Sequence, residues 1–375
     1  MIVVIPKETV AGETRVALVP EGVQKLKAAG CTMRVEAGAG EHASFTDAAY
    51  ESAGAEIARD PTSLYANAGV VLKVQAPRAE EIKQIPQGAL LAGFLSPLTS
   101  PELLSNLAAR RITALAVELI PRITRAQVMD ALSSQATVAG YKAALSAAHA
   151  TGRFFPMLMT AAGTIPPARV LVLGAGVAGL QAIATARRLG AIVSGFDIRP
   201  AAKEQVESLG AAFVGMQLQE AEGSGGYAAE VSEETKKKEH EHLRKLVSES
   251  DIVICTAQVP GKRAPVLVTR DMVAAMKPGS VIVDLAAENG GNCELTQAGK
   301  DVTDHGVTVQ GPVNLAATLP THASFMYSRN LVALITPMIK DGMLTVDLSD
   351  DVTGPACVTH EGEVRVGKPA VAATT

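Results

Sequence analysis

Tryptophan is absent from this sequence of 375 residues, and aromatic side chains make up only 3% of it. Alanine, valine, leucine and glycine must therefore fill the interior, which favours parallel sheets covered by closely packed helices. Positive charge is not concentrated either, because Lys and Arg are scattered and the formal net charge is −4. Proteins that bind nucleic acid gather basic residues on one surface, so the sequence argues against a nucleic acid partner.

Cysteine is scarce, and its placement argues against disulfides and metal sites. The four cysteines are Cys31, Cys255, Cys293 and Cys357. They are far apart and include no CxxC pair, so we expect them to be reduced and to bind no metal, as in a cytosolic protein. His240 and His242 are two residues apart and point to different faces of a helix, which predicts solvated side chains rather than metal ligands.

Long apolar runs are missing as well. The most apolar late stretch, 331–339, contains Pro337 and is far shorter than the ~20 residues that a membrane span needs. The N-terminal run 1–5 has no basic leader before it, which predicts a first β-strand rather than a signal peptide. We therefore expect no direct membrane span.

Two successive series of short β-branched runs alternate with Ala-rich amphipathic stretches. The first series of predicted strands is 2–5, 34–36, 70–74, 90–94 and 113–116. The second begins at Arg169 and continues with 192–196, 212–214, 252–255, 281–284 and 307–309. Such alternation predicts βαβ units, and the chain is longer than one core usually organises. We expect an α/β protein with two doubly wound, Rossmann-like domains.

Long helices are expected to join these domains. Residues 127–149 are rich in Ala, Ser and Leu and predict a helix that carries the chain into the second domain. Residues 322–339 predict another, which returns the chain to the first. The first domain is then discontinuous, with limits of 1–132 plus 325–375, and the second comprises 133–324.

The clearest motif is a strand, a glycine-rich turn and a helix in immediate succession. Gly174, Gly176 and Gly179 occupy the GxGxxG positions, with Ala175 and Val177 between them. The first glycine permits the tight turn, the second lets the backbone approach a pyrophosphate, and the third lets the helix pack closely on the sheet. The motif predicts a dinucleotide-binding site and no metal.

An acidic residue then favours NAD(H) over NADP(H). Asp197 lies 23 residues after Gly174, the distance at which an acid binds the adenosine ribose hydroxyls and repels a 2′-phosphate. Arg199, which follows Ile198, could instead accommodate that phosphate, and it leaves NADP(H) as an alternative. Ligands bind at the carboxyl ends of strands in such folds. The strand 252–255 therefore adds Gln258 and Val259.

Nearly the whole chain resembles a known family. The matching segments are PKET at 6–9, GETRVA at 12–17, PRITRAQVMDALSSQ at 121–135, the glycine-rich turn at 174–186, FDIRP at 196–200, GGYA at 225–228, PGSVIVDLA at 278–286 and YSRN at 327–330. So many segments in order are similar to the NAD(H)-binding components of proton-translocating transhydrogenases, which are related in fold to alanine dehydrogenase.

The resemblance implies an enzyme subunit that is active only with partners. It would exchange hydride directly and reversibly between its own NAD(H) and NADP(H) on a β subunit. Membrane subunits, including a small membrane α subunit, would couple this transfer to proton translocation. The resemblance also implies a homodimer that is cytoplasmic and peripheral on the inner face of the bacterial cell membrane.

Two groups of residues acquire a role through the resemblance. Those placed near the nicotinamide are Arg122, Gln127, Asp130 and Ser133, and those in a loop over the bound nucleotide are Gly226 and Tyr227. Direct hydride transfer needs alignment at about 3–3.5 Å but no acid or base, so hydrogen-bonding side chains suffice. The small polar segment 220–227 is expected to be mobile when empty and ordered by nucleotide.

Structural interpretations of these residues stay open beside the functional ones. Gln127 and Asp130 equally suit the opening turn of the long helix, where an acid is favourable. Tyr227 equally suits the tip of a loop.

Two rival functions remain, a free-standing alanine or amino-acid dehydrogenase and a non-catalytic NAD-binding redox sensor. Arg15 and Lys73 match the pair that holds the substrate carboxylate in alanine dehydrogenase, although both could be merely structural charges. Ser96 stands where that enzyme carries His, and Glu288 stands where it carries Asp. Amino-acid oxidation needs a proton acceptor beside the substrate carbon, so Ser96 argues against it. The nicotinamide loop 122–130 argues against a mere sensor.

We predict that the chain alone does not oxidise alanine or any other common amino acid, because Ser96 replaces the expected base. The measurement is NADH formation from each amino acid at neutral and at alkaline pH. Turnover typical of a dehydrogenase with any of them would contradict the assignment.

Overall fold

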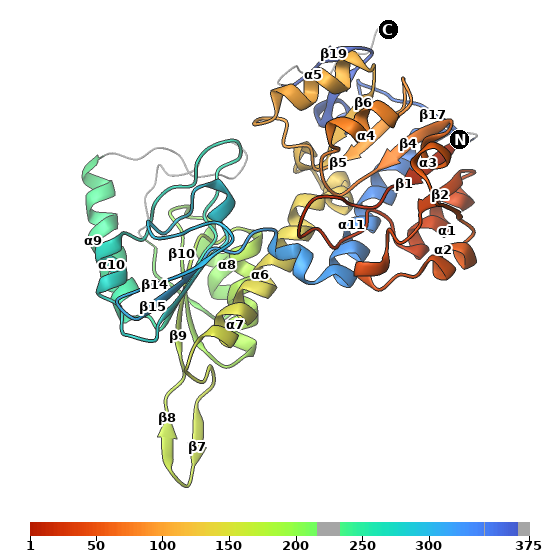
Figure 1. Cartoon of the computed structure of the whole chain (residues 1–375). Helices are drawn as coiled ribbons and strands as arrows, with labels where there is room; N and C mark the ends of the chain where they lie inside the picture. The colour runs from red at the N-terminus through yellow and green to blue at the C-terminus, as the bar shows by residue number, and fades with distance from the viewer. Residues whose placement is uncertain (216–232, 341, 367–375) are drawn as a thin grey trace. The chain divides into compact units, whose positions relative to one another are not determined.

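The computed structural model describes residues 1–215, 233–340 and 342–366. By internal contacts the chain forms two compact units, one of Met1–Gln135 with Ala317–Thr375 and the other of Ala136–Ala316. Each unit is built around a mostly parallel sheet with helices on its two faces (Figure 1). The predicted fold class, with two doubly wound units and a discontinuous first one, is confirmed.

The first unit contains a sheet in the order β19-β18-β6-β5-β4-β1-β2-β3. Its strands are β1 (Ile2–Ile5), β2 (Thr32–Glu36), β3 (Glu56–Ala58), β4 (Ala68–Leu72), β5 (Leu90–Gly93), β6 (Thr113–Ala116), β18 (Cys357–His360) and β19 (Glu363–Val364). Strands β1 to β6 pair in parallel, and β18 and β19 add an antiparallel edge. The chain passes from β1 to β2 on one side and later to β4 on the other. The carboxyl ends of β1 and β4 therefore form the point where such sheets bind ligands.

Helices cover both faces of this sheet. They are α1 (Pro20–Ala28), α2 (Asp47–Ala53), α3 (Pro61–Tyr65), α4 (Ala79–Gln84), α5 (Pro101–Ala109), α11 (Pro320–Ile335) and α12 (Thr353–Ala356). Val3 of β1 joins a core with Leu26 of α1 and Leu331 of α11. Its neighbour Val4 joins the opposite core, which includes Leu104 of α5. Successive side chains of a strand point to opposite faces of the sheet. Val3 and Val4 must therefore both be apolar, because each face is covered by helices.

The second unit repeats the plan in the order β11-β10-β9-β12-β13-β15-β14. Its strands are β9 (Arg169–Leu173), β10 (Ile192–Phe196), β11 (Ala212–Phe213), β12 (Ile252–Cys255), β13 (Val281–Asp284), β14 (Asp301–Asp304) and β15 (Val307–Gln310). All neighbours are parallel except β14 and β15. The chain runs outward from β9 in one direction and resumes beside it at β12. The carboxyl ends of β9 and β12 are therefore the equivalent ligand position.

The helices of this unit and the small hairpins complete the fold. The helices are α6 (Ala131–Ala150), whose first turn belongs to the first unit, α7 (Val177–Arg188), α8 (Ala202–Ser208), α9 (Glu233–Glu249) and α10 (Arg270–Ala274). The hairpins are β7 (Leu158–Thr160) with β8 (Gly163–Ile165), and β16 (Ile339–Lys340) with β17 (Met343–Leu344). Val172 of β9 packs in one core with Ile183 of α7, and its neighbour Leu171 packs in the other with Leu243 of α9.

Both long helices differ from their predicted limits. Instead of starting at 127, α6 begins at Ala131, and the preceding residues form the 3₁₀ segment η3 (Thr124–Met129). Pro320 begins α11, where its fixed φ and missing N–H suit the first turn. Helix α11 lies wholly in the first unit, so the chain returns to that unit before this helix begins, at the 3₁₀ segment η6 (Leu315–Thr318).

Several negative findings apply to the described residues. None of their helices combines the length and the apolar character needed to cross a membrane, and no three of their His, Cys, Asp or Glu side chains are grouped to hold a metal ion. All four cysteines are buried and free. The prediction that the His242 side chain is solvated was wrong, because this side chain is half-buried and its Nε2 lies 2.7 Å from the carbonyl oxygen of Val214.

Candidate functional site

The glycine-rich turn leaves β9 and enters α7 with a geometry that its glycines allow. Gly174 has a φ of 94°, a left-handed conformation that suits glycine. A Cβ on Gly179 would lie 1.8 Å from the carbonyl oxygen of Gly174, so a side chain there would prevent α7 from starting this close to the turn. A Cβ on Gly176 would meet nothing within 4 Å. The turn is closed toward the sheet and open at Gly176, which fits a phosphate at the N-terminus of α7.

Asp197 follows β10 and is tied to this turn. Its Oδ2 accepts a 2.8 Å hydrogen bond from the backbone N–H of Ala175. Arg199 folds onto the same carboxylate, with Nε 2.9 Å from Oδ1 and Nη2 2.8 Å from Oδ2. Burial alone would raise the pKa of Asp197, but hydrogen bonds from Arg199 and Ala175 outweigh it and lower the pKa below its ordinary value. Asp197 is therefore ionised at neutral pH, and the charge of Arg199 is directed to it.

A buried asparagine fixes the loop that follows β12. Asn292 is 0% exposed. Its Oδ1 accepts a 3.0 Å hydrogen bond from the N–H of Ala257, and its Nδ2 donates to the Ala257 carbonyl at 2.8 Å. The backbone N–H of Asn292 donates in turn to the buried carboxylate of Asp284 at 2.7 Å. The ends of β12 and β13 are thereby joined into one rigid edge.

The other nucleotide-site candidates lie at the same edge of the second unit. Val177 is the first residue of α7 and is 40% exposed. Ile198 and Val259 are half-buried. Gln258 is exposed, and its side-chain amide donates to the carbonyl of Leu285 at 2.7 Å. The structure thus gathers the described candidates of this unit around the carboxyl ends of β9, β10 and β12.

In the first unit, four candidates lie together in and around η3. They are Arg122, Gln127, Asp130 and Ser133. Asp130 accepts a 2.8 Å hydrogen bond from the N–H of Ser133 and a 2.6 Å bond from its hydroxyl, so it caps α6. Arg122 and Gln127 are exposed. Among the described residues, no hydrogen-bond partner contacts the Gln127 side chain, which leaves its amide available to a ligand.

Arg15 and Lys73 lie in buried ionic contacts past the ends of β1 and β4. Arg15 Nη2 is 2.6 Å from Glu13 Oε2, and its Nη1 donates to Gln135 Oε1 at 2.8 Å. Burial would raise the pKa of Glu13, but the hydrogen bonds and charge of Arg15 lower it to about 2. Lys73, which is 0% exposed, is 2.7 Å from Glu81 Oε1. Both cations are therefore neutralised by carboxylates of the chain itself.

Ser96 and Glu288, which mark the departures from alanine dehydrogenase, are both exposed. The backbone N–H of Ser96 donates to Glu118 Oε1, and Ser96 has a φ of 48°. Burial raises the pKa of Glu118. Glu288 lies after β13 and accepts a 3.3 Å hydrogen bond from the N–H of Asn314.

Some residues lie outside the predicted site or outside the structure. Gly226 and Tyr227, with the rest of 220–227, are not among the described residues. Two buried asparagines had no predicted role, namely Asn292 and Asn330. The latter donates to the carbonyl of Val128, beside Gln127, at 2.9 Å. The sequence signal for Asn330 was its place at the end of the matching segment 327–330.

Comparisons with known proteins agree with this geometry. Two family models match, "Alanine dehydrogenase/PNT, N-terminal domain" over residues 4–139 and "Alanine dehydrogenase/PNT, C-terminal domain" over 143–367. An NAD(P) transhydrogenase subunit alpha protein of Rhodospirillum rubrum is 49% identical over 97% of this chain and 97% of that protein. The crystal structure of transhydrogenase from Sinorhizobium meliloti has a TM-score of 0.89 at 45% identity, covering 97% of this chain and 100% of that one. Alanine dehydrogenase of Bacillus subtilis is 33% identical over 85% of this chain and 81% of that protein. This chain belongs to the alanine dehydrogenase/PNT family.

Proposed function

We propose that this chain is the NAD(H)-binding α subunit of a proton-translocating NAD(P) transhydrogenase. It transfers hydride reversibly between NADH and NADP⁺ held on a partner subunit. The observation that carries the proposal is the 49% identity to a transhydrogenase subunit alpha, which extends over 97% of both chains. The four polar residues in and around η3 provide a candidate chemical site for this function.

The second unit binds NAD(H), which supplies the hydride when it is bound. Gly174 to Gly179 and the N-terminus of α7 hold the pyrophosphate, and the ionised Asp197 holds the ribose hydroxyls. Gln258 and Val259 follow β12 at the carboxyl end of the same sheet and belong to this nucleotide site. By family resemblance, Gly226 and Tyr227 belong to the same site. The open space at Gly176 supports the assignment of the glycine-rich turn to the pyrophosphate.

The segment around η3 positions the reacting ring without moving a proton. Gln127 offers an exposed amide, and Arg122 offers an exposed guanidinium. The two oxygens of Asp130 are oriented by Ser133, which fixes the directions in which they accept further hydrogen bonds. Because direct hydride transfer needs no acid or base, rigid hydrogen-bonding groups are sufficient.

The rival function as an amino-acid dehydrogenase finds little support in the first unit. Arg15 and Lys73 are each paired with a glutamate, so a substrate carboxylate would have to displace an existing partner. The hydroxyl of Ser96 is too weak a base to accept the proton that amino-acid oxidation releases. A redox sensor without catalysis would have no use for the exposed amide of Gln127.

The assembly is proposed from the family. The partners are an NADP(H)-binding β subunit and a small membrane α subunit, and they carry the proton pathway. This chain would be cytoplasmic and peripheral on the inner face of the bacterial cell membrane.

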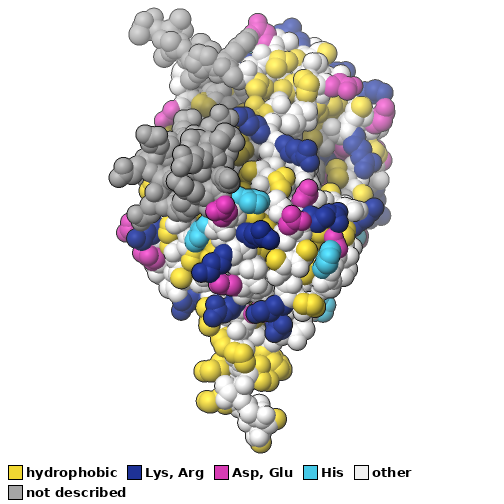
Figure 2. All heavy atoms as spheres, turned by 90° about the vertical axis from the view of Figure 1, so that its left-hand side faces the viewer, with side chains coloured by type: hydrophobic (Ala, Val, Ile, Leu, Met, Phe, Trp, Pro, Cys, Tyr) yellow, Lys and Arg dark blue, Asp and Glu magenta, His cyan; other side chains and the backbone are white. Residues whose placement is uncertain are grey.

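A homodimer is supported by an exposed apolar surface on the β7–β8 hairpin and at its base. Its members are Phe154, Met157, Met159 and Ile165, which are 54, 56, 78 and 39% exposed. The hairpin projects from the second unit (Figure 1), and hydrophobic side chains gather on it and at its base (Figure 2). A lone two-stranded hairpin is marginally stable in water, and an apolar patch of this kind marks a protein–protein surface. A second copy related by two-fold symmetry would cover it.

The hairpin generates a prediction about mass in solution. By light scattering the protein should have twice the chain mass of 38.8 kDa. Met159→Asp combined with Ile165→Asp should yield monomers, because two buried charges would face the partner. The control is Met343→Asp, at a residue that is 68% exposed in another hairpin and should stay dimeric. A dimeric hairpin variant would contradict this interface.

Asp197 generates a prediction about cofactor choice. Competition binding should show NADH preferred over NADPH by at least tenfold, about 1.4 kcal/mol. Because the pKa of Asp197 is lowered, the carboxylate stays charged, and the preference should hold from pH 8 down to about pH 5. Asp197→Asn should reduce it. Equal affinities in the wild type would mean that Arg199 overrides the acid.

The third prediction concerns hydride transfer itself. Gln127→Asn and Asp130→Asn keep the polarity but move or change one hydrogen bond, and a misplacement of about 1 Å can cost on the order of a hundredfold in rate. Single-turnover transfer to a partner-bound NADP⁺ analogue should fall tenfold or more, while the NADH Kd changes only a few-fold. Gln84→Asn, at an exposed glutamine of α4, is the control. Wild-type speed in both site variants would refute the assigned roles.

A further inference from the structure

The backbone of η3 is attached to the rest of the first unit at a small number of points. Ala126 and Met129 are buried, whereas the side chain of Val128 is 64% exposed. Between them, the carbonyl of Val128 accepts a 2.9 Å hydrogen bond from Asn330 Nδ2. This bond holds the Val128–Met129 peptide, one residue beyond Gln127.

Asn330 is itself the last member of a relay of hydrogen bonds that is buried at Arg15 and partly buried from Ser134 onward. Arg15 Nη1 donates to Gln135 Oε1 at 2.8 Å, and Gln135 Nε2 donates to Ser134 Oγ at 3.2 Å. Ser134 Oγ lies 2.7 Å from Asn330 Oδ1 and 3.0 Å from the carbonyl oxygen of Ala131, and in this relay its single proton is donated to Asn330, the nearer acceptor. Each link donates in the same direction, from a permanent cation toward the carbonyl of Val128. Hydrogen bonds aligned in this way polarise and strengthen one another.

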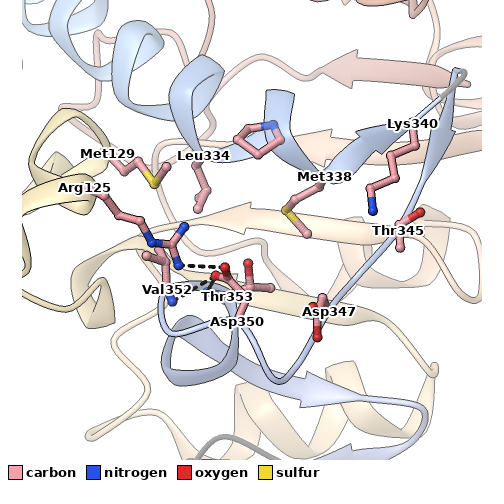
Figure 3. A pocket seen from close by; sticks show the side chains of 11 residues that line it. Arg125, Met129, Leu334, Met338, Lys340, Thr345, Asp347, Asp350, Val352 and Thr353 are labelled. Atoms are coloured by element: carbon pink, nitrogen blue, oxygen red, sulfur yellow. Dashed lines mark hydrogen bonds and ion pairs between the residues drawn. The ribbon is translucent and has the colours of Figure 1, made fainter. Parts of the chain in front are cut away.

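Other contacts hold η3 less firmly. Behind it lies a cavity of about 140 Å³ lined by Met129, Leu334 and Met338 (Figure 3). Arg125 pairs with Asp350 at 2.6 Å and also with Asp351, but its side chain is 48% exposed, and such exposed pairs contribute little. The pocket leaves space beside Met129, so the hydrogen bond from Asn330 adds to the burial of Ala126 in limiting a shift of η3.

We propose that Asn330 is a positioning residue for hydride transfer. Ser134 and Gln135 connect Asn330 to Arg15. Arg15 therefore helps to hold the segment that carries Gln127 and Asp130. Arg15 thus has a role without contacting any substrate. The proposal rests on the proposed function, because it concerns the reaction assigned to that segment.

Asn330→Asp tests the proposal with almost no change in shape. A carboxylate at 330 still accepts from Ser134 but cannot donate to Val128, whereas a protonated carboxyl group can. Burial raises the pKa of such an acid, so the proton is bound at low pH and lost as pH rises. Single-turnover transfer should be slowed tenfold or more at pH 8 and should recover toward wild-type speed as pH falls toward 5. The NADH Kd should change less than three-fold throughout.

The control is Thr359→Val, which removes another hydrogen bond from a buried side chain to a carbonyl. Thr359 is 0% exposed, and its hydroxyl donates to the carbonyl of Ile112 at 2.8 Å. The melting temperature of the Thr359→Val variant should fall about as much as that of Asn330→Asp. Its transfer rate should equal that of the wild type at every pH. A rate loss in Asn330→Asp that is independent of pH, or no loss at pH 8, would overturn the proposal.

Amide exchange separates this inference from the proposed function. At pH 8, Asn330→Asp should lose protection at least tenfold across 124–130 and keep wild-type protection in β1 and β4. Unchanged protection across 124–130 would overturn the anchoring whatever the enzyme does. If the wild type transferred no hydride but Asn330→Asp still lost protection across 124–130, the proposed function would be rejected. The inference that Asn330 anchors η3 would then stand.

Discussion

Burial of each sheet on both faces is the constraint on which the rest of the structure depends. Strands such as β1 and β9 send alternate side chains into two separate cores, and an unpaired polar group in either core would be costly. Polar groups therefore gather where strands end. Lys73 follows β4, Asp197 follows β10, and Asp284 ends β13. The carboxyl edge of each sheet becomes the place where chemistry can be arranged.

The two edges are filled in different ways. In the first unit, Arg15 and Lys73 are matched by carboxylates of the chain, so that edge is electrically satisfied without a ligand. In the second, the backbone at Gly176 faces open space beside the N-terminus of α7. This contrast supports binding of the nucleotide by the second unit.

The pairing of Arg15 with Glu13 also explains why the first edge can serve as a rigid support. The pKa of Glu13 falls from an ordinary value of 4.5 to about 2. A depressed pKa in the folded state contributes stability above the unfolded pKa, and this contribution is lost only as pH falls through the folded value. The pair therefore stays charged throughout the physiological range, and the hydrogen bonds that begin at Arg15 keep their direction.

The sequence by itself determined the strands and the nucleotide motif. Residues 2–5 and 252–255 are strands as predicted, because a strand buried on both faces must be an unbroken apolar run. Residues 192–196 are a strand as predicted too, although Ser194 and Gly195 interrupt their apolar run. The turn at 174–179 was equally readable, since its glycines are fixed by local spacing. Tertiary structure decided the short strand β3, the start of α6 and the roles of the buried asparagines. Val128 and Asn330 meet although 202 residues separate them, and no local pattern specifies which distant donor reaches which acceptor.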